Sequence, residues 1–341
     1  MVFSSMRVTI KDIAERAQVS KTVVSLYLNR RPLAEKFAAE TKARIDAAVR
    51  ELGYRPNYAA RALARGKTRT IGMVTTSILD PFYHNMVDLV MRELAEAGYR
   101  LVLMIQQEGN DLADACFEQL LTQQVDGLLC CVSWPLSGKI SEELQKKRAP
   151  LVLLNCSFPG FSASFADPSQ ALEEAVQFLA ERGQRKLAVI TQHSYRKRNL
   201  IFEVCCKQRM EAELFADIDT EESLEACCHK LAEQRPACLQ VTNCRIVKTI
   251  LRFLDRAAPD YSPEIITSRA VPVDDVSDPR IVGTVVAPFR TMVIDGVRCL
   301  LRQVEEGVPE QSELFCHMAE FFPRSRFDEL EVPAPFDYQI S

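Results

Sequence analysis

The sequence of 341 residues lacks any apolar run that approaches the roughly 18 residues of a membrane-spanning helix. Its longest run, Gly127–Pro135, has the length of a β-strand. The first eight residues, MVFSSMRV, also lack the apolar stretch of a secretory signal. We therefore expect a cytoplasmic protein.

Motifs of catalysis and of metal binding are missing as well. The four His residues are scattered and form no H-E-x-x-H pattern, and no Gly-rich phosphate-binding loop is present. The sequence thus predicts no enzyme, no cofactor and no metal site.

Cysteine is plentiful, but its spacing does not match the usual disulfide and metal frameworks. All 12 Cys lie between Cys116 and Cys316, three pairs are adjacent in the sequence, and no C-x-x-C occurs. Adjacent cysteines rarely form an ordinary disulfide, and zinc sites usually need C-x-x-C spacing. We expect reduced thiols that pack as small core side chains, and thiol sensing or metal binding as the alternatives.

Charge is divided unevenly along the chain. The net charge of −4 would by itself argue against a nucleic-acid partner. Residues 1–70, however, contain 15 Lys and Arg against 6 Asp and Glu, a net charge of +9, whereas the rest of the chain has 27 against 40, or −13. A basic N-terminal module on an acidic body is typical of a nucleic-acid-binding head joined to a ligand or partner domain. A basic segment that is merely solvated is the alternative.

Residues 8–64 show helical periodicity with short connections. The pattern predicts a first helix around Ile10–Ala17, a second over about Lys21–Asn29 and a third over about Ala39–Leu52. Ser20 is expected to cap the second helix, because its hydroxyl can accept a hydrogen bond from the first turn.

The second helix has two different faces when its residues are placed at about 100° intervals. A core face is formed by four apolar or aromatic residues, Val23, Val24, Tyr27 and Leu28. The opposite face carries short polar groups, one Lys and one exposed Leu, namely Lys21, Thr22, Ser25, Leu26 and Asn29. Such a face suits the DNA major groove, so the sequence predicts a helix-turn-helix, with a generic three-helix bundle as the alternative.

From residue 70 onwards, strand patterns alternate with helical ones. The buried-strand runs are 70–76, 101–106, 127–132, 151–155, 186–191, 237–242 and 283–287. This alternation predicts α/β units with parallel sheets and helices on both faces. Because about 270 residues exceed one such unit, we expect two doubly wound lobes that bind a ligand in the cleft between them, at the carboxyl ends of their strands.

Several motifs of the N-terminal region resemble those of one bacterial family. The run VTIKDIAERAQVS at residues 8–20 is followed by ELGYRPN at 51–57 and by the pattern A-R-x-L at 60–63. Over residues 8–67 the sequence closely resembles the DNA-binding head of the lactose-repressor/galactose-repressor (LacI/GalR) family of transcription regulators. The remainder resembles the periplasmic-binding-protein-like body of that family over about residues 69–326.

The resemblance implies a division into four parts. It places the helix-turn-helix head at 6–56, a hinge helix and linker at 57–68, a two-lobed effector-binding and dimerisation body at 69–330, and a tail at 331–341. The first lobe takes about 69–163 plus 289–318, and the second about 164–288 plus 319–330. The tail has two Pro and few apolar positions at heptad spacing, so we expect no tetramerising coiled coil.

The resemblance also implies which residues of the head contact DNA. Base contacts are expected from Lys21, Thr22 and Leu26. Backbone contacts are expected near Thr9, Lys11, Ser20, Ser25 and Asn29. Leu26 departs from the Arg that is usual in the family. It offers only apolar contact, for example with a thymine methyl group, so we expect an atypical half-site.

Three further head positions depart from the family. Val23 replaces a usual Thr, Gln18 stands where a turn Gly is common, and Ala38 stands where a Ser usually caps the third helix. We expect that last helix to be less well capped, at a cost of about 1 kcal/mol.

The hinge segment Asn57–Ala64 is too short to be helical alone in water. In the family this segment becomes a helix on the operator, and two copies enter the minor groove, where a Leu wedges between bases. Leu63 matches the wedge, and Asn57 and Ala60 match other hinge positions. A linker residue that packs on its own body is the alternative for Leu63.

The resemblance places the effector residues in both lobes of the body. Asp80 and Phe82 are the candidates in the first lobe, and Trp134, the only Trp, follows a strand end and is a further candidate. Arg198, Asn243 and Asp274 are those of the second lobe. Polar groups of this kind suit sugar hydroxyls, sugar phosphates or sugar acids.

Departures from the family cluster in the second lobe. The usual Asp after Asn243 is Cys244, and the usual Asn after Asp167 is Pro168. Three interpretations remain open: an unusual non-sugar effector, an ordinary sugar in a rebuilt pocket, and a weakened or lost response to ligand.

Together these features predict a homodimeric, nucleoid-associated DNA-binding regulator, most simply a repressor. It would bind a pseudo-palindromic operator, and a small-molecule effector would control its affinity. A solute-binding protein is the alternative from another class, but the attached head and the missing signal argue against it.

Overall fold

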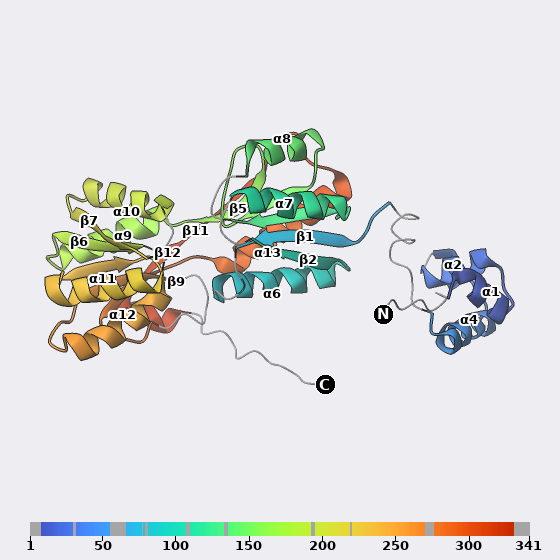
Figure 1. Ribbon diagram of the computed structural model, residues 1–341, viewed down its shortest axis with the longest axis horizontal. Helices are drawn as coiled ribbons and strands as arrows, with labels where there is room; N and C mark the ends of the chain where they lie inside the picture. Colours follow the sequence, from blue (N-terminus) through green and yellow to red (C-terminus); the bar gives the residue numbers. More distant parts are fainter. Residues whose placement is uncertain are drawn as a thin grey trace. The chain divides into compact units, whose positions relative to one another are not determined.

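The computed structural model describes residues 8–29, 32–54, 66–76, 78, 81–106, 110–132, 136–191, 195–218, 220–269 and 276–330. The chain divides into two compact units, residues 1–68 and 69–341. Figure 1 shows a small helical unit and a larger unit with two sheets. Within the described residues, no helix is long and apolar enough to cross a membrane.

The first unit, called the head, consists of α1 (Ile10–Ala17), α2 (Lys21–Leu28), α3 (Pro32–Glu35) and α4 (Ala39–Leu52). The three main helices meet around a small core of fully or nearly buried side chains, Ile13, Ala14, Ala17, Val24, Ile45 and Ala48. The three long helices expected from the sequence are present. The one-turn helix α3 was not predicted, because four residues are too few to show periodicity.

The second unit, called the body, begins with a sheet of six parallel strands in the order β11-β5-β4-β3-β1-β2. Its strands are β1 (Thr70–Thr75), β2 (Arg100–Ile105), β3 (Gly127–Cys131), β4 (Leu151–Leu154), β5 (Ser162–Asp167) and β11 (Leu314–Met318). Helices α6 (Pro81–Glu96) and α13 (Phe289–Glu306) share one core cluster with it. Helices α7 (Asn110–Thr122) and α8 (Gly138–Lys146) share another, on the opposite face.

A second sheet of six strands has the order β12-β10-β9-β8-β6-β7. Its strands are β6 (Lys186–Thr191), β7 (Glu211–Asp217), β8 (Cys238–Val241), β9 (Glu264–Arg269), β10 (Ile281–Val286) and β12 (Glu320–Pro323). All neighbouring pairs are parallel except β10 and β12, which are antiparallel. The doubly wound α/β prediction is confirmed, and the antiparallel edge strand β12 is a feature that the alternation of elements did not reveal.

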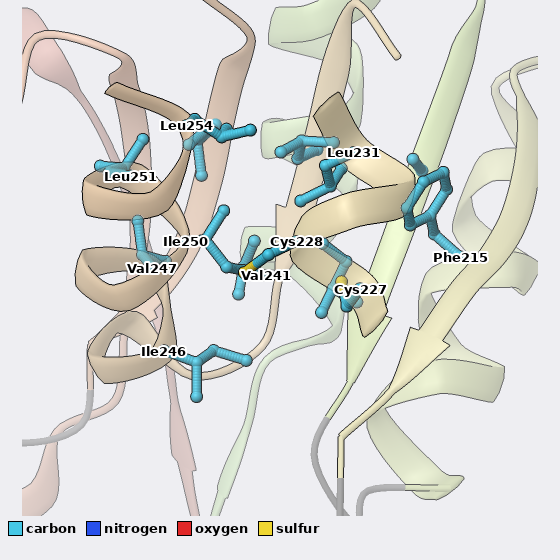
Figure 2. Packing of buried hydrophobic residues seen from close by; sticks show 14 of the residues in the cluster. Phe215, Cys227, Cys228, Leu231, Val241, Ile246, Val247, Ile250, Leu251 and Leu254 are labelled. Carbon is cyan, nitrogen blue, oxygen red and sulfur yellow. The ribbon is translucent and has the colours of Figure 1, made fainter. Parts of the chain in front are cut away.

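Helices cover both faces of the second sheet. Helices α9 (Ser169–Glu181) and α10 (Tyr195–Lys207) pack in one cluster. Helices α11 (Glu221–Gln234) and α12 (Cys244–Ala257) pack in the other, where Figure 2 shows Leu231 of α11 and Leu254 of α12 pointing toward one another. A 3₁₀ helix, η1 (Arg324–Glu329), follows β12.

The chain passes between the two sheets three times. It leaves the first sheet after β5 and enters α9, returns from β10 into α13, and leaves again from β11 into β12. Only short links join the elements at these passages, with Pro168, Ala287-Pro288 and Ala319 between them. Short links of this kind restrict how the two sheets can move.

Most cysteine side chains that the structure describes are buried, as expected for small core residues. Cys227 and Cys228 of α11 belong to the cluster in Figure 2. Burial raises the pKa of Cys227 to about 12 and that of Cys205 to about 11, which keeps these thiols protonated at neutral pH. Cys206 and Cys316 are exposed. Among the described residues, no group of His, Cys, Asp and Glu is arranged to hold a metal ion.

Candidate DNA-binding surface and effector residues

A tight turn joins α1 to α2 in the head. Gln18 adopts the left-handed conformation (φ 52°) and caps α1, and its backbone N–H reaches the carbonyls of Ala14 and Glu15. Ser20 then caps α2, because its Oγ accepts a hydrogen bond of 3.2 Å from the Val23 N–H. The expected cap is present, and the two helices form a helix-turn-helix.

The core face of α2 lies as predicted. Val24 is fully buried, and Val23, Tyr27 and Leu28 pack partly buried against the same core. Tyr27 also donates a hydrogen bond of 2.9 Å to Asp46 of α4, and this bond raises the pKa of the Tyr27 hydroxyl. This hydrogen bond fixes the orientation of α2. The helical periodicity of α2 did not predict the bond, because the bond joins two different helices.

The opposite face of α2 is open at its N-terminal end. Lys21 and Thr22 are exposed, whereas Ser25, Leu26 and Asn29 are half-buried. The sequence predicted an exposed Leu26, and the structure leaves this side chain half-buried. Leu26 nevertheless differs from Val24 and Tyr27, which pack against the core cluster.

The C-terminal end of α2 uses its polar side chains for capping. The Asn29 side-chain amide donates a hydrogen bond of 2.8 Å to the Ser25 carbonyl and lies 3.4 Å from Ser25 Oγ. In this arrangement the two residues rigidify the helix end. If Ser25 or Asn29 contacts DNA, it must use donors and acceptors that this bond leaves available, or atoms that take part in both bonds.

Two other predicted contact residues lie at the start of α1. Thr9 caps the helix, and its hydroxyl and N–H donate to Asp12 Oδ2 over 2.8 and 2.7 Å. The bonds from the Thr9 backbone and hydroxyl hold the pKa of Asp12 below its usual value. Lys11 is exposed, and its Nζ lies 3.7 Å from Glu15 Oε1.

An open hollow of about 540 Å³ lies over the turn of the motif. It is lined by residues of α1, the turn and the start of α2: Lys11, Ala14, Glu15, Gln18, Val19, Ser20 and Lys21. Three of the predicted contact residues, Lys11, Ser20 and Lys21, therefore share one surface. Two Lys side chains and the helix-start N–H groups there can bind an anion such as a phosphate. The predicted hinge residues Asn57, Ala60 and Leu63 lie outside the described residues.

In the body, Phe82 lies at the start of α6, directly after the loop that follows β1. Its ring packs edge-on against Tyr83 and Phe289, with centroid distances of 5.2 and 5.4 Å. Phe82 is half-buried, and its ring packs against the first turn of α13. Asp80 and Trp134 lie outside the described residues.

The two described effector candidates of the second lobe follow neighbouring strands. Arg198 lies in α10, which follows β6, and Asn243 lies in the two-residue link between β8 and α12. Because β6 and β8 pair in parallel, both residues belong to the carboxyl edge of the second sheet, and both are half-buried. Asp274 lies outside the described residues.

Asn155, which directly follows β4, was not predicted as a site residue. It is exposed and left-handed (φ 58°), at the carboxyl edge of the first sheet. A polar residue that follows a fully apolar strand, LVLL, was the available signal. Asn155 is therefore a further candidate for ligand contact.

Comparisons with known proteins agree with this architecture. Residues 9–57 match the family model "Bacterial regulatory proteins, lacI family", and residues 68–199 match "Periplasmic binding proteins and sugar binding domain of LacI family". The two models follow one another along more than half of the chain. The chain belongs to the LacI family.

Curated relatives of this LacI-family protein include named repressors. The ribose operon repressor of Escherichia coli K12 is 34% identical over 188 residues, which cover 54% of this chain and 55% of that protein. The HTH-type transcriptional repressor PurR of Serratia proteamaculans is 34% identical over 189 residues, with 53% of each chain covered. The matches thus span about half the length of these curated relatives.

Solved structures resemble the whole fold at lower identity. The lac repressor dimer bound to operator and the anti-inducer ONPF has a TM-score of 0.77 at 20% identity, and covers 92% of this chain and 98% of its own. A LacI-family regulator from Silicibacter pomeroyi has a TM-score of 0.75 at 18% identity, with 93% and 98% covered. These likenesses support the fold.

Proposed function

We propose that this protein is a transcriptional repressor that binds a specific operator through the exposed face of α2. The observation that carries the proposal is the helix-turn-helix itself. It presents Lys21 and Thr22 to solvent beside the hollow over the turn, in a head with a net positive charge. Relatives named as repressors support it.

The protein acts as a homodimer in this proposal, so that two heads bind two half-sites of a pseudo-palindrome. Supporting this, apolar side chains are exposed beside two free strand edges of the body. Met91 of α6 is 53% exposed and Ile105 of the edge strand β2 is 43% exposed, while Leu214 of the edge strand β7 is 37% exposed. A symmetric contact would bury these side chains and the free edges together.

The effector in this proposal is a small molecule that binds at the carboxyl edges of the two sheets. A sugar or a related metabolite is favoured, because one relative is named for ribose and one structural neighbour is titled as a cellobiose complex. The pocket residues are Phe82, Arg198 and Asn243, together with Asp80, Trp134 and Asp274. The alternative is that the pocket has diverged to bind a non-sugar ligand, because Cys244 stands where the family usually has Asp. The site of action is the cytoplasm, at the DNA.

Selection from a random DNA library tests the proposal. The full-length protein should enrich a two-fold symmetric consensus. Lys21→Ala combined with Thr22→Ala should lose that consensus, because the pair supplies the exposed polar end of α2. Glu174→Ala on the exposed surface of α9 is the control and should enrich the wild-type sequence. Recovery of unrelated sequences by the wild type would overturn the proposal.

A thermal-shift screen tests the effector. Sugars, sugar phosphates and sugar acids are added to the full-length protein one at a time, and a ligand should raise the unfolding temperature by an amount that grows with the logarithm of its concentration relative to its Kd. Arg198→Ala should abolish that rise. If none of these compounds shifts the transition, the sugar-class effector is wrong.

A further inference from the structure

The edge strand β11 carries a strip of apolar side chains that are exposed. Leu314 and Met318 are 60% and 52% exposed, and Cys316 between them is exposed as well. These three residues, called the β11 strip, share one face of the strand because side chains alternate along it. On the neighbouring strand β5, Phe165 pairs with Cys316 and packs partly buried against the core of the first sheet. The β11 strip is therefore an exposed margin of that core.

The backbone of β11 is open along its outer edge as well. Among the described residues, β11 is the last strand of the first sheet and pairs only with β5. The Glu313 carbonyl and the Ala319 N–H both form hydrogen bonds of 2.9 Å with β5. Because backbone groups alternate in direction along a strand, those of Leu314, Cys316 and Met318 point away from β5. An edge of this kind is a template for a further strand.

The tail, residues 331–341, lies outside the described residues, and its sequence has the pattern of a half-buried strand. The run FDYQI at 336–340 alternates apolar with polar residues, so an extended chain carries its three apolar side chains on one face. The preceding VPAP at 332–335 favours an extended linker, and a Pro just before a strand removes no hydrogen bond from the sheet. The tail thus has the same period of two as the β11 strip.

The tail begins close to the end of β11. Only Ala319 separates β11 from β12, and η1 follows β12 directly (Figure 1). Arg326 of η1 donates hydrogen bonds of 2.8 Å to Glu320, the first residue of β12, and of 2.6 Å to Glu329. These bonds hold the end of η1 close to the start of β12, two positions after Met318. From there, the linker 331–335 reaches about 15 Å when it is extended.

We propose that the run at 336–340 binds the free edge of β11 in the same chain, as a further strand of the first sheet. Because the tail arrives at the Met318 end, it runs antiparallel to β11, with Tyr338 opposite Cys316 at the centre. Its apolar face then covers the β11 strip. Its polar face lies on the other side of the sheet, where His317 and Asp295 are polar neighbours.

The bound tail has two consequences for the body. It closes a strand edge that could otherwise pair with the edge of another chain. It also connects the two lobes, because it starts from η1, which packs on the second sheet, and ends on the first. Arg324 of η1, for example, donates a hydrogen bond of 3.0 Å to the Ile281 carbonyl of β10. The tail therefore adds a non-covalent link to the three passages of the chain.

Amide hydrogen exchange tests the added strand, because the outward amides of β11 gain hydrogen-bond partners only when a strand binds there. In the full-length protein, the amides of Leu314, Cys316 and Met318 should exchange at least about tenfold more slowly than in the double variant Phe336→Ser with Tyr338→Ser. The amides of the two residues between them face β5 and should stay protected in both proteins, which makes them the internal reference.

A second double variant, Asp337→Ser with Gln339→Ser, is the matched control. It changes the polar face of the same run and should keep the slow exchange of the wild-type protein. Fast exchange of the outward β11 amides in the wild type would overturn the proposal. Equal loss of protection in the two double variants would overturn it as well, because a strand must distinguish its two faces.

Crosslinking with a short bismaleimide decides which copy of the chain supplies the tail. In Tyr338→Cys, we expect a link to Cys316 within one chain, identified by mass spectrometry of the band that runs as a monomer on a denaturing gel. Cys316→Ser in the same background should remove this link, although Cys206 is also exposed. A covalent dimer joined through these two positions, or no link between them, would contradict binding of the tail within its own chain.

Discussion

Single residues of the head decide what the surface of α2 can recognise. Lys21 and Thr22 offer hydrogen bonds, while Leu26 offers only apolar contact, in a half-buried position. The sequence allowed the two faces of α2 to be predicted because helical geometry fixes them. The partial burial of Leu26 depends on tertiary packing and was not predictable from helical periodicity alone.

Leu26→Arg should change operator preference rather than strengthen binding to every sequence. Arg can bond guanine O6 and N7 together, which is worth about 1–3 kcal/mol of discrimination at that base pair. Selection from a random library with each protein measures this. Identical consensus sequences from the two proteins would contradict the assignment of Leu26 to the reading face.

Gln18→Gly should stabilise the head. Gln18 holds a left-handed conformation (φ 52°) that costs a residue with a side chain about 1–2 kcal/mol, while Gly adopts it freely but loses more entropy on folding. We expect a net gain of up to about 1 kcal/mol, measured by slower hydrogen exchange of the α1 amides in the full-length protein. Faster exchange would mean that the Gln18 side chain makes an important contact.

At the scale of elements, the sequence revealed the long head helices and the strands with the strongest apolar runs. The long head helices and the buried strands β1, β3 and β4 follow from continuous or periodic apolar residues. The strands β5, β7, β9 and β11 were not predicted. β7 and β11 are edge strands that bury few of their residues, and β11 alternates exposed with half-buried positions. β5 and β9 lie inside their sheets, but Ser, Thr and charged residues shorten their apolar runs. The antiparallel β12 depends on a tertiary contact, which no local pattern encodes.

Ala38→Ser should stabilise α4. Ala38 precedes the helix in an extended conformation but has no side-chain cap, as the sequence predicted. A Ser hydroxyl there can accept from the first turn, a gain of about 1 kcal/mol, or about fivefold in the opening equilibrium. Hydrogen exchange of the first α4 amides checks this, and Ala38→Gly is the comparison that adds no side-chain acceptor. Unchanged protection in Ala38→Ser would count against the cap.

Leu63→Ser tests the proposed hinge, which lies outside the described residues. If Leu63 wedges between bases in the minor groove, its loss should sharply weaken operator binding, because the cost of bending DNA is then no longer offset by apolar contact. Thermal unfolding of the body should stay unchanged. An unaltered affinity in a gel-shift titration would refute the hinge assignment.

For the whole molecule, the division of charge supports the division of tasks. The head carries the positive charge and the body the negative charge, so attraction to DNA is confined to the heads. Control of DNA affinity by the body is therefore a matter of how the heads are positioned.

The most direct test of the account is the affinity of the full-length protein for its selected operator and for an unrelated duplex across a salt series, measured by fluorescence anisotropy. We predict binding to the operator at least about 10³-fold tighter at physiological salt. The logarithm of each affinity should fall linearly with the logarithm of salt concentration, because phosphate contacts release counterions. Equal affinity for the two duplexes, or a flat salt dependence, would contradict the account.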